Sequence, residues 1–465
     1  MRFAELETRD VAIWGCGREG RAALAALRRR FADKPLTLYC KAGEIEAARD
    51  LIDGNVRVIE AAPDAGALSS HDVVIKSPGI SAYRPEILAA MERGTRFTSG
   101  TALWFGENVR GASDDARVVA VTGTKGKSTT TAMLAHCARA LGIRTALAGN
   151  IGLPLLELDG QRAELWALEL SSFQTGEAGP VEVGVVVSLE EEHLDWHGSR
   201  ERYIADKLKL AGVARTLVVD ARSPLLMERS AGHPHRVTFG GDGGWHVRDG
   251  DLCRGAVVID PSLAAFRQVP GMHNVLNACA ALAALDAVGA LDAGDAARVA
   301  ARSLARFRGL PHRLQRLGLQ RGVEWIDDSI ATTPAAALAA LHSTGDRAAT
   351  LILGGFERGL DWDGFAGALA AHPPHAIVVQ GANAARIAEA LSRAAVQAHV
   401  ERADGLADAV GRARGLDAPG GVVLLSPGAP SFDQFRDYAE RGRCFAALAG
   451  FDAAALGDIE GLGIR

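Results

Sequence analysis

The chain has 465 residues, of which 48% are hydrophobic and 23% are charged, and its formal net charge is −5. This length exceeds one ordinary hydrophobic core and predicts two to four domains. The weakly acidic charge excludes a basic surface for nucleic acid, and no window approaches the roughly twenty apolar residues of a membrane span. The acidic start Met1–Glu7 is also unlike a secretory signal.

Cysteine and lysine are both sparse and both informative. Six cysteines are scattered without a CxxC spacing, which disfavours disulfides or zinc and predicts reduced thiols in the cytoplasm. Only seven lysines occur, and four of them form two pairs, Lys125 with Lys127 and Lys207 with Lys209. Because arginine keeps its proton, a site that needs a neutral amine must use lysine. Both pairs are therefore candidates for chemistry.

Residues 1–112 are predicted to form a first domain with a Rossmann-like parallel sheet, because apolar strands alternate with a helical pattern. The predicted elements are strands at Val11–Trp14, Leu36–Tyr39 and Asp72–Ile75 and a helix that ends near Arg30.

A GxGxxG sequence, Gly15 to Gly20, follows the first of these strands. A dinucleotide site would need an acidic residue after the second strand, but Tyr39-Cys40-Lys41 stands there, which disfavours NAD. Two interpretations stay open: the diphosphate of another nucleotide rests on the helix start, or the turn binds nothing.

After a polar linker at 111–116, residues 113–308 are predicted to form a central α/β domain of the P-loop ATPase type. Its first strand, Arg117–Val121, leads into Gly123-Thr-Lys-Gly-Lys-Ser128 and a helix over about Ser128–Leu141. In this order, backbone N–H groups of the loop and the helix N-terminus point at an anion. We expect Lys127 to reach the β- and γ-phosphates of ATP and Ser128 to contact Mg²⁺. Val121 stands where the strict pattern has glycine, so the loop is a variant, and a plain turn is the alternative.

Two further strand ends of this domain carry metal-binding side chains. The strand Leu165–Leu168 ends at Glu169, and Val181–Val187 is followed by an acidic segment that contains His193. Such a segment is more often a solvated loop than a metal site. Beside a phosphate loop, however, the two together predict a Mg²⁺–ATP centre. A helix is expected to begin at Tyr203 and to carry Lys207. The domain is completed by a β-hairpin within Gly240–Gly255 and by helices at Val275–Val288 and Ala293–Leu304.

Residues 309–465, after a hinge at Phe307–Arg313, are predicted to form a third domain with a doubly wound, Rossmann-like sheet. Its expected strands are Glu324–Asp327, Thr350–Leu353, Ala376–Val379 and Gly421–Leu425. The whole chain is thus expected to be a three-domain α/β protein.

At these residues the sequence resembles the Mur ligases of bacterial peptidoglycan synthesis over nearly its whole length. The motifs that carry the resemblance are Gly123–Ser128, Gly149–Gly152, Glu169–Gln174, His193 with Lys207, Gly271–Asn277, Leu310–Arg313, Asp328-Ser329 and Leu425–Pro427. The segments Glu169–Gln174 and Ser431–Phe435 are most similar to the glutamate-adding members.

The resemblance implies a reaction and a set of residues. A UDP-muramyl-alanine carboxylate would attack the γ-phosphate of ATP, and glutamate would then attack the resulting acyl phosphate. Catalytic roles would fall to Lys127, Glu169, His193 and Lys207. Two Mg²⁺ ions would be held by Ser128, Glu169, His193 and Lys207, the last in the form of a carbamate. ATP would be bound by Gly123, Thr124, Lys125, Gly126, Lys127, Ser128, Thr129, Asn274, Arg313 and Asp328.

The same resemblance implies residues for the other substrates and a set of partners. UDP-muramyl-alanine would lie at Gly15, Gly17, Ser77, Gly79 and Asn150, and further substrate contacts would come from Ser171, Thr332, Arg358, Ser431 and Phe432. The protein would act as a cytoplasmic monomer, with no nucleic-acid or membrane partner.

Three positions depart from the usual glutamate-adding pattern. Ile330 replaces a lysine, Arg358 replaces another lysine, and Phe432 replaces the commoner leucine. These changes reshape the amino-acid pocket. Together with Trp14–Arg21 and Asp328–Pro334, they favour the branch that adds L-glutamate and works with a separate epimerase; D-glutamate is the alternative.

Two other functions compete with this hypothesis. A folylpolyglutamate synthase has a related core but would not need the Gly15–Gly20 and Ser77–Gly79 segments. In a nucleotide-binding protein without ligase activity, or in an inactive homologue, His193 and Lys207 would have no functional role.

Overall fold

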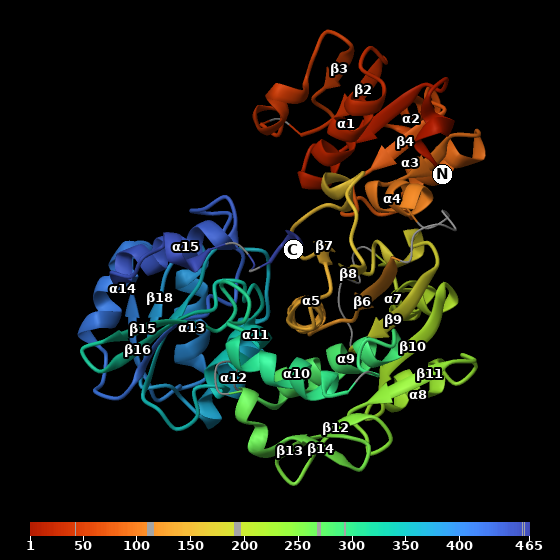
Figure 1. The fold of residues 1–465 in the computed structure, drawn as a ribbon. Coiled ribbons are helices and arrows are strands. Elements are labelled where there is room, and N and C mark those ends of the chain that lie inside the picture. The colour runs from red at the N-terminus through yellow and green to blue at the C-terminus, as the bar shows by residue number, and fades with distance from the viewer. Residues whose placement is uncertain are drawn as a thin grey trace. The chain divides into compact units, whose positions relative to one another are not determined.

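The structure, a computed structural model, describes residues 1–41, 43–108, 116–189, 197–266, 271–292, 294–457, 459 and 461–465. It divides into two compact units, Met1–Arg308 with Gly461–Arg465, and Gly309–Glu460. The α/β class expected from the sequence is confirmed, with two sheets in the first unit and one in the second (Figure 1).

The first sheet has five parallel strands in the order β3-β2-β1-β4-β5. They are β1 (Val11–Trp14), β2 (Leu36–Tyr39), β3 (Val56–Ile59), β4 (Val73–Lys76) and β5 (Arg96–Thr98). The helices are α1 (Arg18–Arg30), α2 (Ala65–Ser69), α3 (Pro85–Glu92) and α4 (Gly100–Asn108).

Both faces of this sheet are buried at its central strands β1 and β4, where every residue is buried. Side chains such as Val11 and Ile13 pack with α1 and α4, whereas their neighbours Ala12 and Trp14 pack with α2 and α3 on the opposite face. A parallel sheet covered on both faces is the reason for continuous apolar strands such as Val11–Trp14.

The second sheet has ten strands in the order β14-β13-β12-β11-β10-β9-β6-β8-β7-β21. They are β6 (Arg117–Thr122), β7 (Thr145–Gly149), β8 (Leu165–Glu169), β9 (Val181–Val186), β10 (Ala214–Asp220), β11 (Arg236–Phe239), β12 (Trp245–Arg248), β13 (Asp251–Arg254), β14 (Val257–Asp260) and β21 (Gly463–Ile464). Its helices are α5 (Lys127–Ala140), α7 (Arg200–Leu208), α8 (Pro224–Arg229), α9 (Met272–Ala287) and α10 (Ala296–Ser303). The predicted hairpin is confirmed, since β12 and β13 are antiparallel.

The end of the chain returns to this second sheet. β21 pairs antiparallel with β7, and Arg139 on α5 donates to the Gly463 carbonyl at 3.1 Å. Residues 461–465 therefore belong to the first compact unit, although the sequence-based division counted them in the third domain.

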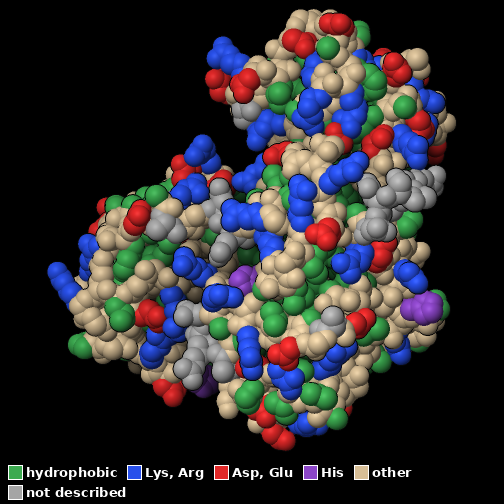
Figure 2. Space-filling view, viewed as in Figure 1, with side chains coloured by type: hydrophobic (Ala, Val, Ile, Leu, Met, Phe, Trp, Pro, Cys, Tyr) green, Lys and Arg blue, Asp and Glu red, His purple; other side chains and the backbone are tan. Residues whose placement is uncertain are grey.

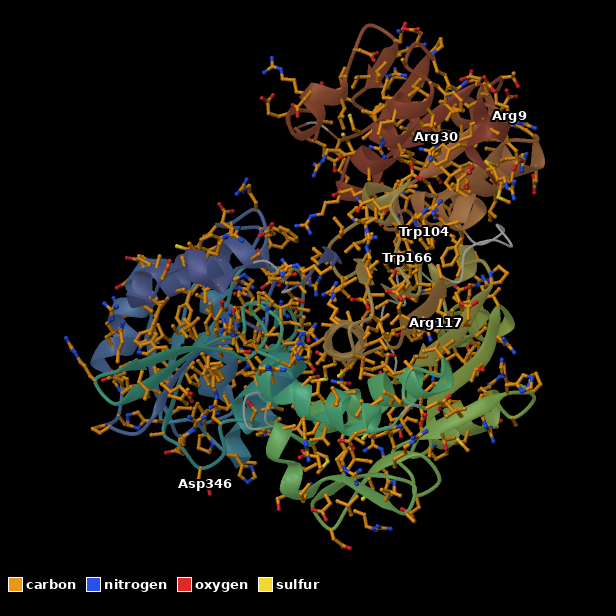
Figure 3. All side chains as sticks on the ribbon, viewed as in Figure 1. Arg9, Arg30, Trp104, Arg117, Trp166 and Asp346 are labelled. Atoms are coloured by element: carbon orange, nitrogen blue, oxygen red, sulfur yellow. The ribbon has the colours of Figure 1, made fainter. Side chains whose placement is uncertain are left out.

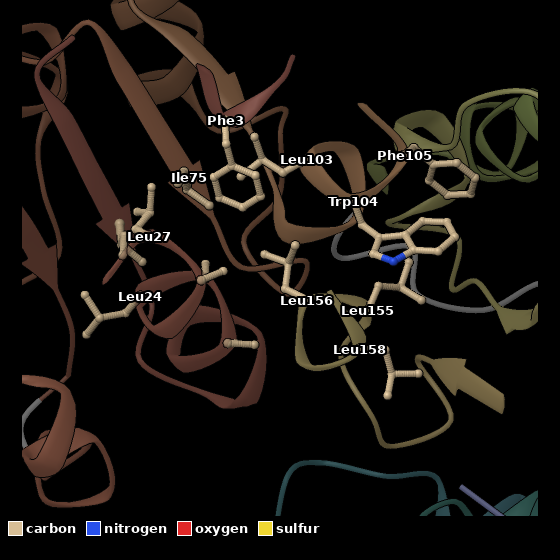
Figure 4. Close-up of a cluster of buried hydrophobic side chains, with 14 of the residues drawn as sticks. Phe3, Leu24, Leu27, Ile75, Leu103, Trp104, Phe105, Leu155, Leu156 and Leu158 are labelled. Carbon is tan, nitrogen blue, oxygen red and sulfur yellow. The ribbon is translucent and has the colours of Figure 1, made fainter. Parts of the chain in front are cut away.

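A hydrophobic core is shared by the first and second sheets. Phe3, Leu24 and Ile75 from the first sheet's layer lie in one cluster with Leu155 and Leu156, which precede β8 (Figure 4). Trp104 on α4 stacks edge-on against Trp166 of β8, with 4.8 Å between the ring centroids (Figure 3). Such continuous packing holds the two sheets together in one compact unit.

The second unit holds a six-stranded sheet in the order β15-β16-β20-β17-β18-β19. Its strands are β15 (Gln315–Gln320), β16 (Val323–Asp327), β17 (Ala349–Leu353), β18 (Ala376–Val379), β19 (His399–Arg402) and β20 (Val422–Leu425), all parallel except the edge strand β15. Its helices are α11 (Pro334–His342), α12 (Trp362–Ala371), α13 (Ala384–Arg393), α14 (Leu406–Gly415) and α15 (Tyr438–Ala449). α11–α13 cover one face and α14 and α15 the other, as expected for a doubly wound sheet.

Basic and acidic side chains are interspersed on the face that Figure 2 shows, in keeping with the small net charge. None of the helices in the described ranges combines the length and the apolar character that crossing a bilayer requires.

Candidate active site

Four neighbouring strands of the second sheet end at one edge. β6 lies between β8 and β9, and β7 lies beside β8, all parallel, so their carboxyl ends meet. The segments that follow them carry Gly123–Ser128, Asn150, Glu169–Ser171 and Ser188. Ligands of open α/β sheets bind at such an edge. The structure thus brings together several residues that the sequence analysis selected separately.

The glycine-rich loop joins β6 to α5 and requires glycine at two positions. Gly126 has a φ of +81°, and a side chain there would overlap the Asn277 amide of α9. A side chain on Gly123 would overlap Val187. The loop is therefore held against β9 and α9, and Gly126 forms the left-handed start of α5 with no side-chain cap. A helix that starts at a glycine turn in this way presents its first N–H groups toward the loop, where an anion can bind.

The lysines of the loop differ in environment. Lys127 begins α5, and its Nζ donates to the Thr124 carbonyl at 2.8 Å, folding back over the loop. Lys125 is exposed, and its backbone N–H donates to the Ser188 hydroxyl at 2.8 Å. Lys127 thus places its ammonium on the loop itself.

Glu169 ends β8 and is 1% exposed. Its Oε1 accepts from the Asn150 amide at 2.8 Å, whereas its Oε2 is buried and has no hydrogen-bond partner among the described residues. A buried carboxylate oxygen without a partner is costly unless a cation compensates it. Glu169 therefore fits a Mg²⁺ ion that Ser128 would share.

His193 was predicted to help hold a second ion, but it lies outside the described residues. Within the described ranges, no group of three or more His, Cys, Asp or Glu side chains is arranged around a metal position. A centre built from Glu169, a serine hydroxyl and a modified lysine would not form such a group.

Lys207 lies in the last turn of α7 and is 2% exposed. Its Nζ donates to the Gly123 carbonyl at 2.7 Å and lies 4.8 Å from the centre of the Tyr203 ring. The hydroxyl of Tyr203 is in turn 2.7 Å from that of Thr124. The expectation that α7 begins at Tyr203 is wrong, because Ser199 caps the helix by accepting from the Arg202 N–H and α7 begins at Arg200.

Three further predicted residues, Asn274, Ser171 and Thr129, lie on three different elements of this unit. Asn274 lies in the first turn of α9, the helix whose Asn277 contacts the loop at Gly126. Ser171 follows β8, and its hydroxyl donates to Gln174 at 2.8 Å. Thr129 is buried in the first turn of α5.

The GxGxxG turn lies at the carboxyl end of β1 in the first sheet. A side chain on Gly20 would overlap the Gly15 carbonyl, so this close approach of helix to turn requires glycine. The hydroxyl of Ser77, just after β4, is buried against Gly15 and has no hydrogen-bond partner among the described residues. α1 begins at Arg18, and its N-cap residue Gly17 provides no side-chain cap. A diphosphate could satisfy both the helix N–H groups and this hydroxyl.

Glu19, in the first turn of α1, is a partly buried acid beside this turn. Burial raises its pKa to about 7, and the charges of Glu177 and Glu157 add to the effect. Folding therefore favours the protonated form. The stability is greatest below the ordinary pKa of 4.5 and falls as the pH rises through about 7.

We expect Glu19→Gln to be more stable than the parent protein at pH 8, by roughly 3 kcal/mol, and nearly equal to it at pH 4.5. The amide cannot ionise, so only the parent loses stability over this interval. The melting temperatures of both proteins between pH 4.5 and 8.5 test this. Glu7→Gln, at an exposed position of the same sheet's layer, is the control, and a Glu19→Gln difference that does not change with pH would contradict the prediction.

In the second unit, Arg313 and Asp328 lie on neighbouring segments. Asp328 follows β16, and its two carboxylate oxygens accept from the Ser426 hydroxyl at 2.7 Å and the Leu314 N–H at 3.1 Å. Burial raises its pKa to about 7, although these two bonds and the charge of Arg313 oppose the shift. On either side of Arg313, His312 and Leu314 have φ values of +60° and +45°. Such strained backbone is often kept for function.

The predicted amino-acid residues occupy three loops of the second unit, after β16, β17 and β20. Arg358 is exposed, and its guanidinium donates to the Thr332 carbonyl at 3.3 Å. Ser431 is buried, whereas Phe432 is 67% exposed and its ring centroid lies 6.3 Å from that of Phe356. The three loops are thus in contact, since the Phe356 N–H also donates to the Pro430 carbonyl at 2.8 Å.

Comparison with known proteins gives the family of this chain. The sequence model of the Mur ligase middle domain matches residues 121–285, and that of the Mur ligase glutamate ligase domain matches residues 312–428. A protein of Xanthomonas euvesicatoria named UDP-N-acetylmuramoyl-L-alanine–L-glutamate ligase is 48% identical, with both chains covered completely. The chain belongs to the Mur ligase family. A protein of the same name from Xylella fastidiosa is 46% identical, again with complete coverage of both chains.

Solved structures agree on the fold. The UDP-N-acetylmuramate–alanine ligase of Thermotoga maritima has a TM-score of 0.58 at 21% identity, with 94% of this chain and 98% of the other covered. Mur ligases are ATP-dependent and use Mg²⁺, so this protein is an ATP-dependent ligase.

Sequence reasoning missed several residues around the Mur ligase centre. Tyr203 and Asn277 contact the phosphate loop, yet neither was selected, although both lie inside segments that were. Asp206, next to Lys207, and His197 are buried and bonded to each other, and no local pattern distinguishes them from solvated residues.

Proposed function

We propose that the protein joins L-glutamate to UDP-N-acetylmuramoyl-L-alanine in peptidoglycan synthesis, at the expense of ATP. The full-length relatives that carry this activity in their names support the substrate pair. One observation supports the site: Oε2 of Glu169, which has no hydrogen-bond partner in the part of the chain that the structure describes, and Nζ of Lys207 lie on segments that flank the same phosphate loop.

The proposed chemistry has two steps. A carboxylate oxygen of the muramyl-alanine attacks the γ-phosphorus of ATP, and ADP leaves as an acyl phosphate forms. The amine of glutamate then attacks the acyl carbon, loses a proton, and inorganic phosphate leaves. Bound Mg²⁺ would neutralise the phosphate charge.

Each part of the chain has a proposed task in these steps. Lys127 stabilises the charge that develops on the transferred phosphoryl group, and the helix N–H groups of α5 orient it. Ser128 and Glu169 hold the first ion. A second ion is proposed at His193 and a carbamylated Lys207, whose buried position beside the Gly123 carbonyl supports a role within the centre.

The proposed domains are 1–112 for the UDP group, 113–308 for ATP and 309–465 for the amino acid. Three separate sheets support this division, and the pairing of β21 with β7 argues that the third domain ends before residue 461. Gly15, Gly17, Ser77 and Gly79 are the proposed diphosphate residues, with Asn150 further along the substrate. Asn274, Arg313 and Asp328 are proposed to hold the adenine, the phosphates and the ribose.

Thr332, Arg358, Ser431 and Phe432 are the proposed acceptor residues. Arg358 offers a cation for a glutamate carboxylate, and Phe432 with Phe356 supplies an aromatic wall. The product of an L-glutamate ligase would need a separate epimerase before D-glutamate could appear in the wall. We propose that the protein acts as a monomer in the cytoplasm, in keeping with six unpaired cysteines.

A ligation assay tests the function. Offered UDP-N-acetylmuramoyl-L-alanine and ATP, the protein should form an amide with L-glutamate and release one phosphate per amide. D-glutamate should give at least about a hundredfold less product, because one enantiomer only can present its carboxylate to Arg358 and its amine to the acyl carbon. Product stereochemistry is checked by chiral chromatography after hydrolysis.

Three results would count against the proposal. Ligation of D-glutamate alone would assign the protein to the D-specific ligases. Glutamate addition to folate but not to the UDP substrate would indicate a folylpolyglutamate synthase. Phosphate release without any amino-acid acceptor would indicate a nucleotide-binding protein without ligase activity.

A further inference from the structure

The segment between β4 and α3 is fastened at both ends to the second sheet's layer. At its start, the Lys76 ammonium lies 3.4 Å from Glu177, which also accepts from the Ser99 hydroxyl at 2.5 Å. At its end, the Tyr83 hydroxyl donates to both carboxylate oxygens of Asp206, at 2.8 and 3.0 Å. The residues proposed to bind the diphosphate, Ser77 and Gly79, lie between these two attachments.

Asp206 continues the connection toward the ligation centre. Its Oδ2 accepts from Nδ1 of His197 at 2.6 Å, and Nε2 of His197 lies 3.0 Å from the Ser172 hydroxyl. His197, Asp206 and Ser172 are 0%, 3% and 5% exposed, so water competes little for these bonds. A carboxylate accepts only, which fixes Nδ1 of His197 as a donor.

Two residues of this hydrogen-bond network, Asp206 and Ser172, are close in sequence to the proposed catalytic residues. Asp206 directly precedes Lys207 on α7, and Ser172 lies three residues after Glu169. The backbone carbonyl of Asp206 also accepts from the Thr175 hydroxyl at 2.7 Å, which ties α7 to the segment after β8. A displacement of Tyr83 would therefore reach Lys207 and the Glu169 segment through buried, short bonds.

We propose that Tyr83 and Asp206 are positioning residues that couple occupation of the Ser77–Gly79 segment to the placement of Lys207. The coupling rests on the proposed function for the identity of the ligand, a nucleoside diphosphate group. When the diphosphate orders this segment, Tyr83 holds the Asp206 carboxylate and so fixes the last turn of α7. The enzyme then assembles its centre fully only when the UDP-bearing substrate is present.

Other contacts preserve the local structure when the Tyr83 hydroxyl is removed. The Arg202 guanidinium lies 4.6 Å from the centre of the Tyr83 ring, a contact that phenylalanine keeps. Asp206 retains Lys209, 2.6 Å away, and His197. Tyr83→Phe therefore removes the hydroxyl that donates to Asp206 and leaves the fold of α7 supported.

Tyr39→Phe provides a matched control. Tyr39 lies on β2, and its hydroxyl is 3.0 Å from Nε2 of His71, which is in the first sheet's layer and not on α7. Both variants lose a tyrosine hydroxyl from the first sheet's layer. A merely structural contribution would affect them alike.

The deciding measurement is amide hydrogen exchange of residues 200–208, with UDP as the probe and no turnover. UDP should slow exchange in this segment at least threefold in the parent and in Tyr39→Phe, and should leave it unchanged in Tyr83→Phe. Equal slowing in Tyr83→Phe, or no slowing in a parent protein that binds UDP, would overturn the inference. Because this readout needs no ligation, failure of the proposed glutamate ligation is seen separately.

Enzyme kinetics provide the second test of the proposed coupling. Tyr83→Phe should lower kcat at least tenfold while the dissociation constant for UDP changes less than threefold. The double variant Tyr83→Phe with Asp206→Asn should have a kcat no lower than that of the less active of the two single variants. Residues in one bonded network behave non-additively in this way. A kcat within twofold of the parent, or losses that multiply in the double variant, would overturn the coupling.

Discussion

Replacement of Lys127 by alanine is expected to lower the rate of ligation on the order of 10³-fold. Its ammonium begins α5 and folds over the glycine-rich loop, where a phosphoryl group in transfer carries its greatest charge. The N–H groups of the loop remain in the variant, so ATP should still bind. The loss should therefore appear in kcat more than in the KM for ATP.

Initial rates of phosphate release at saturating substrates measure this effect, and trapping with hydroxylamine reports whether the acyl phosphate still forms. Lys125→Ala serves as the comparator within the loop. Because the Lys125 side chain is exposed, its removal should cost much less. A Lys127→Ala protein that keeps more than a tenth of the parent's kcat, or that loses no more than Lys125→Ala, would refute the proposed role.

The strand and the helix around this loop could be predicted from the sequence, because the residue patterns that indicate them are local. The strand before the loop and the helix after it were predicted within two residues of β6 and α5, since an apolar run, glycines and a helical pattern follow one another directly. The same holds for β1 and β2, whose bounds were predicted without error. Edge strands such as β3 and β19 were not predicted, because their half-exposed residues lack a continuous apolar run.

Contacts between distant segments could not be predicted. The strands β21 and β7 come from distant parts of the chain, and each contains glycine. Neither segment was predicted to be a strand. The bond from Tyr83 to Asp206 joins residues 123 positions apart. Acidic and tyrosine residues on a helix or loop are normally solvated, so only the fold shows that these two are buried together. The start of α7 is different: Ser199, a good cap residue, was available in the sequence and was overlooked.

Lys207 could be selected from the sequence alone, but its contacts are seen only in the structure. The sequence singled it out because lysine is so scarce, and the structure places it, 2% exposed, on the carbonyl of Gly123 at 2.7 Å. A carbamate forms when a neutral lysine amine takes up CO₂ and releases a proton, which converts a cation into an anion that can hold Mg²⁺. Arginine cannot undergo this conversion.

We therefore expect Lys207→Arg to lower kcat on the order of 10³-fold, a loss of about 4 kcal/mol in transition-state stabilisation. The parent protein in ¹³C-bicarbonate should show a carbamate carbon signal that Lys207→Arg lacks. Lys209→Arg is the control, because its side chain is half-exposed and an arginine can keep the ion pair with Asp206. That variant should keep both the carbamate signal and a kcat within a few-fold of the parent.

The two readouts separate the possible roles of Lys207. Loss of both signal and activity in Lys207→Arg supports the carbamate. An active parent without a carbamate signal, combined with an inactive Lys207→Arg, would instead assign the ammonium itself to the loop, through its bond to Gly123. Activity retained in Lys207→Arg would remove this lysine from the centre altogether, because a guanidinium cannot occupy the same buried position and accept CO₂.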